Sequence, residues 1–215
     1  MDAAHAEQYF EAQPSSPSRP HTVSLALPDA TVELATDRGV FSYDAVDDGT
    51  RYLLQEAPLP DDAPARSTVH LLDLGCGYGP IAVTLARRCP RATVWGVDVN
   101  ERAVDLTRRN AAALGLANLH VLAAADPAGA ELAGLPADVR FAAIWSNPPI
   151  RIGKAALHAL LGAWLARLAP DGQAWLVVHK HLGSDSLARW LSDEGWATTR
   201  RSSRGGYRVL HVAPR

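Results

Sequence analysis

The chain has 215 residues, of which 47% are hydrophobic and 20% charged, and its formal net charge is −2. This composition is typical of a globular protein and excludes a disordered chain. The length admits one domain with an appendage but not two full domains. The charge excludes a globally basic nucleic-acid binder, although not a local basic patch.

Cysteine usage and targeting signals set further limits. Cys76 and Cys89 have no His or Cys partner at ligand spacing, so we expect neither a disulfide framework nor a zinc or other metal site. The N-terminus carries no basic-then-apolar run, and no apolar stretch approaches about 18 residues. We therefore expect no signal peptide, no membrane span and a cytoplasmic location.

The first part of the chain predicts an extension that precedes the core. Prolines and serines at the end of residues 1–20 are typical of an extended arm. Alternating apolar residues around Pro28-Asp29-Ala30 predict a β-hairpin, and a helix follows up to Ala57. A loop rich in Pro, Asp and Ala marks the boundary at 58–66. The predicted division is an arm (1–20), a hairpin-and-helix extension (21–66) and a core (67–215).

The core predicts an α/β protein in which strands and helices alternate. The strands are expected at 69–74, 93–99, 119–124, 141–146 and 173–178, and the helices at 81–89, 101–114, 155–168 and 184–193. A closing hairpin is expected at 196–200 and 207–212. Apolar strands that alternate with helices indicate a mostly parallel sheet with helices on both faces.

A glycine loop follows the first core strand. Leu71–Gly79 reads Leu-Leu-Asp-Leu-Gly-Cys-Gly-Tyr-Gly, and Pro80 stands where a dinucleotide-binding loop has its third glycine. Asp73 would repel a pyrophosphate but could bind the ammonium of an amino acid. The loop, with Gly75, Cys76 and Gly77, therefore favours a nucleoside that bears an amino acid. No base stands beside Cys76, which we interpret as a small loop residue and not a nucleophile.

Acidic residues stand at the ends of the next two strands. Asp98, followed by Val99, lies 23 residues after Gly75, near the spacing expected of an acid that binds ribose hydroxyls. Asp126 follows the third strand and could accept a hydrogen bond from an adenine amino group. A helix cap or a surface acid explains Asp126 equally well.

The fourth strand ends in Asn147-Pro148-Pro149-Ile150. Pro149 restricts Pro148 to extended backbone, so the Asn147 side-chain oxygen and the Pro148 carbonyl can both point into the cleft. Two such acceptors can hold a planar amino group and aim its lone pair at an electrophilic methyl, without a strong base. The alternative for this tetrapeptide alone is an ordinary strand-ending turn.

Together these residues resemble a class I S-adenosylmethionine-dependent methyltransferase. The flanking segments narrow the resemblance to the RsmC-like small methyltransferase group, whose named members methylate guanine N2 of small-subunit ribosomal RNA. These segments are Gln8–Phe10, Thr36–Ser42, Asp47–Thr50, Lys180–Ser186 and Gly206–Leu210. The resemblance covers about residues 8 to 212.

The resemblance implies a Rossmann-like fold with a seven-stranded sheet whose last strand is antiparallel. It implies that Asp73, Gly75 and Gly77 bind the methionine part of S-adenosylmethionine. Asp98 would hold the ribose and Asp126 the adenine, and Asn147 with Pro148 would hold the acceptor amine.

The chain departs from the family pattern in two ways. Family members usually carry an aromatic residue after Asn-Pro-Pro, where this chain has Ile150. Another ring, Phe41 or Tyr9, would then have to stack on the base. Full-length RsmC enzymes also carry a second, degenerate methyltransferase-like domain, and this chain resembles only the catalytic half.

The resemblance implies ribosomal RNA or the small ribosomal subunit as partner. Arg151 and Lys154 beside the Asn-Pro-Pro turn and Lys180 after the fifth strand are candidates to bind it through phosphates. Three alternatives stay open: methylation of a glutamine side chain, a non-catalytic cofactor-binding module and, disfavoured by Asp73 and Pro80, a nicotinamide dehydrogenase.

Overall fold

The sheet has seven strands, and its order places the first strand at the centre. In the computed structural model, which describes residues 12–60, 69–126, 128, 132 and 134–215, the order is β5-β4-β3-β6-β7-β9-β8. The strand β9 runs antiparallel to both β7 and β8, and the other neighbouring strands pair in parallel. The strands are β3 (His70–Leu74), β4 (Thr93–Asp98), β5 (Leu119–Ala123), β6 (Phe141–Ser146), β7 (Leu168–His179), β8 (Ala197–Arg204) and β9 (Tyr207–Ala213). The predicted fold class is confirmed, including the antiparallel closing hairpin.

The strand order reverses between β3 and β6. From β3 the chain moves outward to β4 and β5, and it then returns to the other side of β3 as β6. Ligands of open α/β sheets bind beyond the carboxyl ends of the strands at such a switch point. The fold therefore brings the loops after β3, β4 and β6 to one place.

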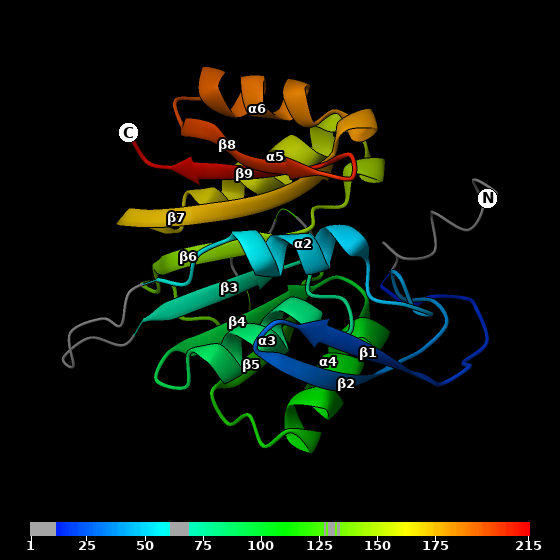
Figure 1. Cartoon of the computed structure of the whole chain (residues 1–215). Coiled ribbons are helices and arrows are strands. Elements are labelled where there is room, and N and C mark those ends of the chain that lie inside the picture. The colour runs from blue at the N-terminus through cyan, green and yellow to red at the C-terminus, as the bar shows by residue number, and fades with distance from the viewer. Residues whose placement is uncertain (1–11, 61–68, 127, 129–131, 133) are drawn as a thin grey trace.

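Helices cover both faces of the sheet (Figure 1). One face carries α2 (Asp48–Glu56), α3 (Pro80–Arg88) and α4 (Glu101–Ala113), whose buried residues share one hydrophobic cluster. The other face carries α5 (Lys154–Leu165) and α6 (Ser184–Asp193), which pack in a second cluster. Within the described residues, no helix is both long enough and apolar enough to cross a membrane.

The N-terminal hairpin packs on the same face as α3 and α4. It consists of β1 (His21–Leu27) and β2 (Ala30–Thr36), and its alternating buried residues join the first cluster. The Asn110 side chain on α4 bonds both the N–H and the carbonyl of Ala35 and also the carbonyl of Tyr78. One buried amide thus connects the hairpin to the glycine loop.

Residues 12–20 run beside the first turn of α4. The Ala12 carbonyl accepts a hydrogen bond from Glu101 N (2.9 Å), and the Arg102 guanidinium donates to the carbonyls of Ser16 and Arg38. Asp37 accepts a hydrogen bond from the Ser18 hydroxyl (2.6 Å). The arm therefore holds the turn that precedes Phe41.

The region between α5 and β7 differs from the sequence expectation. The helix was expected to continue to residue 168, but it ends at Leu165, and Leu168 already pairs with Phe141 as the first residue of β7. The pairing then jumps from Phe141–Leu168 to Ala143–Gln173, so Pro170, Asp171 and Gly172 form a bulge. Proline cannot donate to the ladder, and a bulge accommodates it without ending the strand.

Candidate active site

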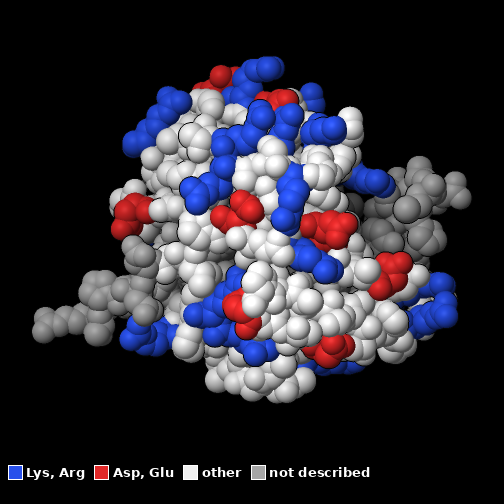
Figure 2. Space-filling model, in the orientation of Figure 1, with Lys and Arg blue, Asp and Glu red and all other residues white. Residues whose placement is uncertain are grey.

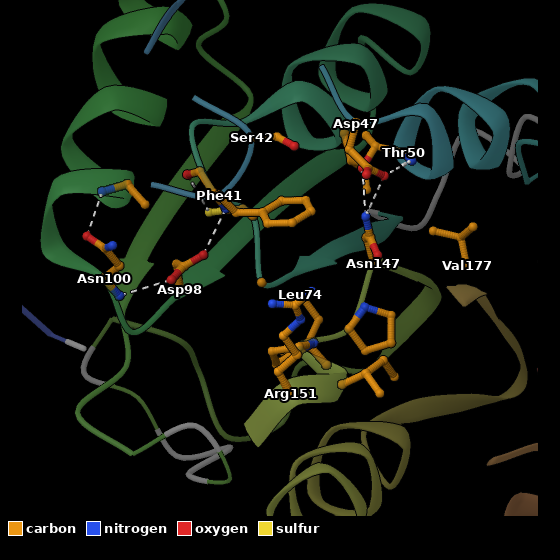
Figure 3. A pocket seen from close by; sticks show the side chains of 18 of the residues that line it. Phe41, Ser42, Asp47, Thr50, Leu74, Asp98, Asn100, Asn147, Arg151 and Val177 are labelled. Carbon is orange, nitrogen blue, oxygen red and sulfur yellow. Dashed lines mark hydrogen bonds between the residues drawn. The ribbon is translucent and has the colours of Figure 1, made fainter. Parts of the chain in front are cut away.

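A cavity of about 890 Å³ lies at the carboxyl edge of the sheet. Its walls include residues from the ends of β3, β4 and β7, residues that follow β6, and residues of the segment Phe41–Asp47. Figure 3 shows Asp98 on one side of this cavity and Asn147 on the other, with Phe41 between them. The volume is in the range of small-molecule and cofactor sites.

The glycine loop has little capacity to bind phosphate, because most of its amides are already used. Gly75 N and Cys76 N both donate to the Val97 carbonyl, and Gly77 N donates to Asp98. Gly79 N donates to the Cys76 carbonyl, and Pro80 has no N–H. A pyrophosphate cradle needs free amides at the helix N-terminus. The structure thus adds a physical argument against the dinucleotide alternative.

Asp98 ends β4 beside the glycine loop. Its Oδ2 accepts Gly77 N (2.8 Å) and its Oδ1 accepts Asn100 N (2.9 Å). Each carboxylate oxygen retains acceptor capacity, which two adjacent ribose hydroxyls can use. Burial raises the pKa of Asp98, and hydrogen bonds from the backbone of Asn100, Gly77 and Val99 oppose that shift.

Asp73 lies beneath the loop, fully buried, and does not line the cavity. Its Oδ2 accepts Ala82 N in the first turn of α3 (2.8 Å), and its Oδ1 has no partner among the described residues. Burial raises the pKa of this carboxyl to about 8. This position fixes the start of α3 to β3 and does not bring the carboxylate to a ligand in the cavity.

Cys76 and Val99 line the cavity between the loop and Asp98. Burial raises the pKa of the Cys76 thiol well above its ordinary value, with the neighbouring carboxylates adding to the shift. A buried thiol of this kind is a poor nucleophile. The position agrees with the interpretation of Cys76 as a small wall residue.

Asn147 lies between β6 and α2. Its Nδ2 donates to Asp47 Oδ2 (2.9 Å) and to Thr50 Oγ1 (3.1 Å), as the dashed lines in Figure 3 show. These bonds use both amide protons. The Oδ1 atom is thereby directed to the opposite side, and Asn147 lines the cavity.

The two prolines shape the next turn. Pro149 has φ −74° and ψ 73°, and the Pro148 carbonyl accepts Ile150 N at 2.8 Å. This is an inverse γ-turn. It uses one lone pair of the Pro148 carbonyl and leaves the second for another donor. Pro148, Pro149 and Ile150 all line the cavity.

Apolar groups border the same cavity. Phe41 and Leu182 are the large hydrophobic side chains of the described residues that are markedly exposed, at 45% each, and both line it. The Phe41 loop is fixed from below, because Asn100 Nδ2 donates to the Gly39 carbonyl (2.8 Å). Exposed apolar side chains at a cavity are typical of a ligand-binding surface.

The remaining predicted residues lie at varying distances from the cavity. Arg151 is exposed and lines it, whereas the exposed Lys154 and Lys180 do not. Asp126 is exposed, does not line the cavity, and accepts Ala128 N at 3.0 Å. Tyr9 lies outside the described residues, as does most of the predicted boundary loop at 58–66.

Several cavity residues were not singled out for a role in the site from the sequence. In the sequence, Asp47, Thr50 and Tyr207 belong only to flanking segments that resemble the family, yet in the structure they line the cavity. Tyr78 also lines it, although the residue is only 2% exposed and its hydroxyl is buried without a hydrogen-bond partner among the described residues. One sequence signal could have identified Asp47. An Asp directly before a helix and three residues ahead of Thr50 is typical of an N-cap.

The cavity fits a nucleoside that bears an amino acid. Gly75 and Gly77 have φ of 76° and 56°, and a Cβ on either would meet only open space, so the loop lies directly against the cavity. Asp98, which lines the cavity, offers carboxylate acceptors to a ribose. The fold and these groups define a class I S-adenosylmethionine-dependent methyltransferase.

Comparison with known proteins gives the family. The methyltransferase small domain model matches residues 31–211, and the chain belongs to the methyltransferase small domain family. A Bacillus subtilis protein, the uncharacterised YbxB, is 34% identical over 187 residues, which cover 87% of this chain and 88% of YbxB.

Two similar proteins carry functional names. The tRNA1(Val) (adenine(37)-N6)-methyltransferase of Porphyromonas gingivalis is 38% identical over 132 residues, which are 61% of this chain and 47% of that enzyme. The structure of the T. thermophilus 16S rRNA N2 G1207 methyltransferase RsmC, in complex with AdoMet and guanosine, matches with a TM-score of 0.72 and 27% identity. That match covers 93% of this chain and 52% of the RsmC chain. The chain spans about half the length of these two enzymes.

Proposed function

We propose that this protein transfers a methyl group to guanine N2 of small-subunit ribosomal RNA. The observation that carries the proposal is the orientation of Asn147, whose amide protons are used by Asp47 and Thr50, so that its oxygen faces the cavity. An inward oxygen accepts a hydrogen bond from an amino group, and the second lone pair of Pro148 can accept another. The similarity to a guanine-N2 methyltransferase over 93% of the chain supports the choice of base.

S-adenosylmethionine, when bound, supplies an electrophilic methyl group. The Asn147 and Pro148 oxygens hold the two hydrogens of the amine, so its lone pair points away from them. They also stabilise the positive charge that develops on the nitrogen, and no side chain has to remove a proton first. Asp98 would hold the ribose of the cofactor, and Gly75, Cys76, Gly77 and Val99 would form the wall beside it. An adenine amino group that extends past the cavity wall would meet the second oxygen of Asp126, which does not line the cavity.

The base needs an apolar surface beside the amine. Phe41 takes the role of the aromatic residue that the chain lacks at Ile150, and Ile150 and Leu182 complete the apolar border. Aromatic stacking on a base contributes about 1–3 kcal/mol. A base inside a helix cannot reach this cavity, so the target is unpaired or flipped.

Cations around the cavity bind the RNA backbone. Arg151 lies at the border, with Lys154 and Lys180 further out. Figure 2 shows many Lys and Arg side chains over the part of the surface where Figure 1 places β8 and β9. Arg200, Arg201 and Arg204 on β8 are exposed, although Arg200 pairs with Asp185 at 3.3 Å. With ribosomal RNA as its substrate, the protein would work in the cytoplasm.

The test is transfer of labelled methyl from S-adenosylmethionine to small ribosomal subunits, naked 16S rRNA and tRNA, each from cells that lack the gene. Digestion to nucleosides should yield N2-methylguanosine from ribosomal RNA. N6-methyladenosine from tRNA would instead support the activity of the P. gingivalis relative, and label in protein alone would indicate glutamine. Asn147→Ala should lower turnover about 10²-fold or more while cofactor affinity stays the same. Equal turnover in this variant would remove Asn147 from the mechanism.

A further inference from the structure

The Asp47 carboxylate connects three separate parts of the fold. As the N-cap of α2, its Oδ2 accepts Thr50 N at 2.9 Å, and the same oxygen accepts Asn147 Nδ2 at 2.9 Å. Its Oδ1 accepts the hydroxyl of Tyr207 on β9 (3.4 Å). Asp47 and Asn147 are 100 residues apart in the sequence.

An asparagine side chain has nearly the same shape in its two amide orientations, so its surroundings decide which end faces the cavity. A carboxylate only accepts hydrogen bonds. An Asn147 oxygen turned toward Asp47 would place two acceptors about 3 Å apart in a partly buried site, which costs free energy. We propose that Asp47 is a positioning residue that holds the Asn147 oxygen toward the acceptor amine. This inference rests on the proposed function.

Packing around Tyr207 keeps the carboxylate in place. A Cβ on Gly49 would lie 2.5 Å from the Tyr207 ring, so only glycine lets the first turn of α2 rest on that ring. The His179 ring meets Tyr207 edge-on, with centroids 5.0 Å apart. Both oxygens of Asp47 are therefore restrained, Oδ2 by α2 and Oδ1 by the Tyr207 hydroxyl.

Two substitutions separate this role from simple helix capping. Asp, Asn and Ser cap a helix about equally well. Asp47→Ser retains a capping oxygen, but its shorter side chain cannot also supply the acceptor for Asn147. Asp47→Asn can place its oxygen where Oδ2 stands, serving both Thr50 N and Asn147, while its amide donates toward the Tyr207 oxygen.

Turnover is the first measurement. Asp47→Ser should lower kcat by about tenfold or more, the effect of losing one oriented hydrogen bond, with the affinity for S-adenosylhomocysteine within about twofold of wild type. Asp47→Asn should recover most of the lost kcat. Asp48→Ser, which removes an exposed carboxylate one residue away, is the matched control and should leave kcat unchanged. Wild-type turnover in Asp47→Ser, or equal losses in the Ser and Asn variants, would overturn the inference.

A second measurement needs no substrate. The free energy of unfolding in urea is compared for wild type, Asp47→Ser, Asn147→Ala and the double variant. If the two side chains hold each other, the double variant loses less than the sum of the single losses. Additive losses would overturn the inference even if RNA is methylated. If no RNA accepts a methyl group, the proposed function fails. The comparison of the four unfolding free energies still decides whether Asp47 holds Asn147.

Discussion

Replacing Asp98 with asparagine tests the cofactor site at the point where the structure is most specific. Each carboxylate oxygen accepts one backbone N–H, from Gly77 or Asn100, and each has capacity for one ribose hydroxyl. Asparagine has almost the same shape but only one oxygen. Its NH₂ group would face one of the two backbone N–H groups, so that two donors would meet without an acceptor. The same NH₂ group could not accept a hydrogen bond from the ribose hydroxyl next to it.

The expected loss follows from these contacts. A hydrogen bond to a charged acceptor contributes about 1.5–3 kcal/mol, and a buried donor without an acceptor costs about 1–3 kcal/mol. Part of the second cost also falls on the free protein, so we take about 3 kcal/mol as the net effect on binding. Since 1.4 kcal/mol corresponds to a tenfold change, Asp98→Asn should weaken cofactor binding by about 10²-fold.

Calorimetric titration with S-adenosylhomocysteine measures this loss directly. Asp105→Asn is the matched control, because Asp105 is an exposed acid on α4 that pairs with Arg108 at 3.4 Å. Burial raises the pKa of Asp98, and only its ionised form accepts from both ribose hydroxyls. Affinity in the wild type should therefore fall as the pH falls through that raised pKa, and Asp98→Asn should lack this dependence. An affinity equal to wild type in Asp98→Asn would refute the ribose role.

Two further predictions concern the apolar border and the buried acid. Phe41→Leu should lower kcat/KM for RNA about tenfold or more, because a stacking surface is lost, with unchanged affinity for S-adenosylhomocysteine; an unchanged kcat/KM would show that another group supports the base. Asp73 has a folded pKa raised to about 8 from an ordinary 3.8, so its favourable contribution to stability is complete below pH 3.8 and is lost as the pH rises toward 8. Between pH 5 and 7 the free energy of unfolding of wild type should therefore fall relative to that of Asp73→Asn, by about 1.4 kcal/mol per pH unit. Parallel stability curves in urea would contradict the raised pKa.

The fold was predictable because its signals are local. Short apolar runs, helix caps and Gly or Pro stops give the strands and helices in order, and the alternation of the two implies a parallel sheet. The segment after α5 was not predictable to the same degree. Pro170 and Gly172 indicate an interruption of regular secondary structure, but not its kind. The pairing of Leu168 with Phe141 shows that the interruption is a bulge inside β7.

The candidate site was predictable where its residues follow a strand. Asp98 is the last residue of β4 and Asn147 directly follows β6, and the carboxyl ends of parallel strands meet at one edge. Asp73 shows the limit of this reasoning. As the fourth residue of the five in β3, it faces the inside of the fold and reaches Ala82 N, not the cavity. A count of residues cannot tell which side of a strand end faces the ligand.

The groups that orient Asn147 were beyond such reasoning, because they come from elements that no strand pattern relates to β6. Asp47 caps α2, and Thr50 lies in the first turn of that helix. Tyr207 is the first residue of β9, which β7 separates from β6 in the sheet. In the sequence they appear as two unrelated short segments, Asp-Asp-Gly-Thr and Gly-Tyr. In the structure the acid caps the helix, the glycine admits the tyrosine ring, and the threonine and the acid together bind the asparagine amide. These segments therefore form one packing unit, and its consequence is the orientation of a single oxygen on which the proposed amine methylation depends.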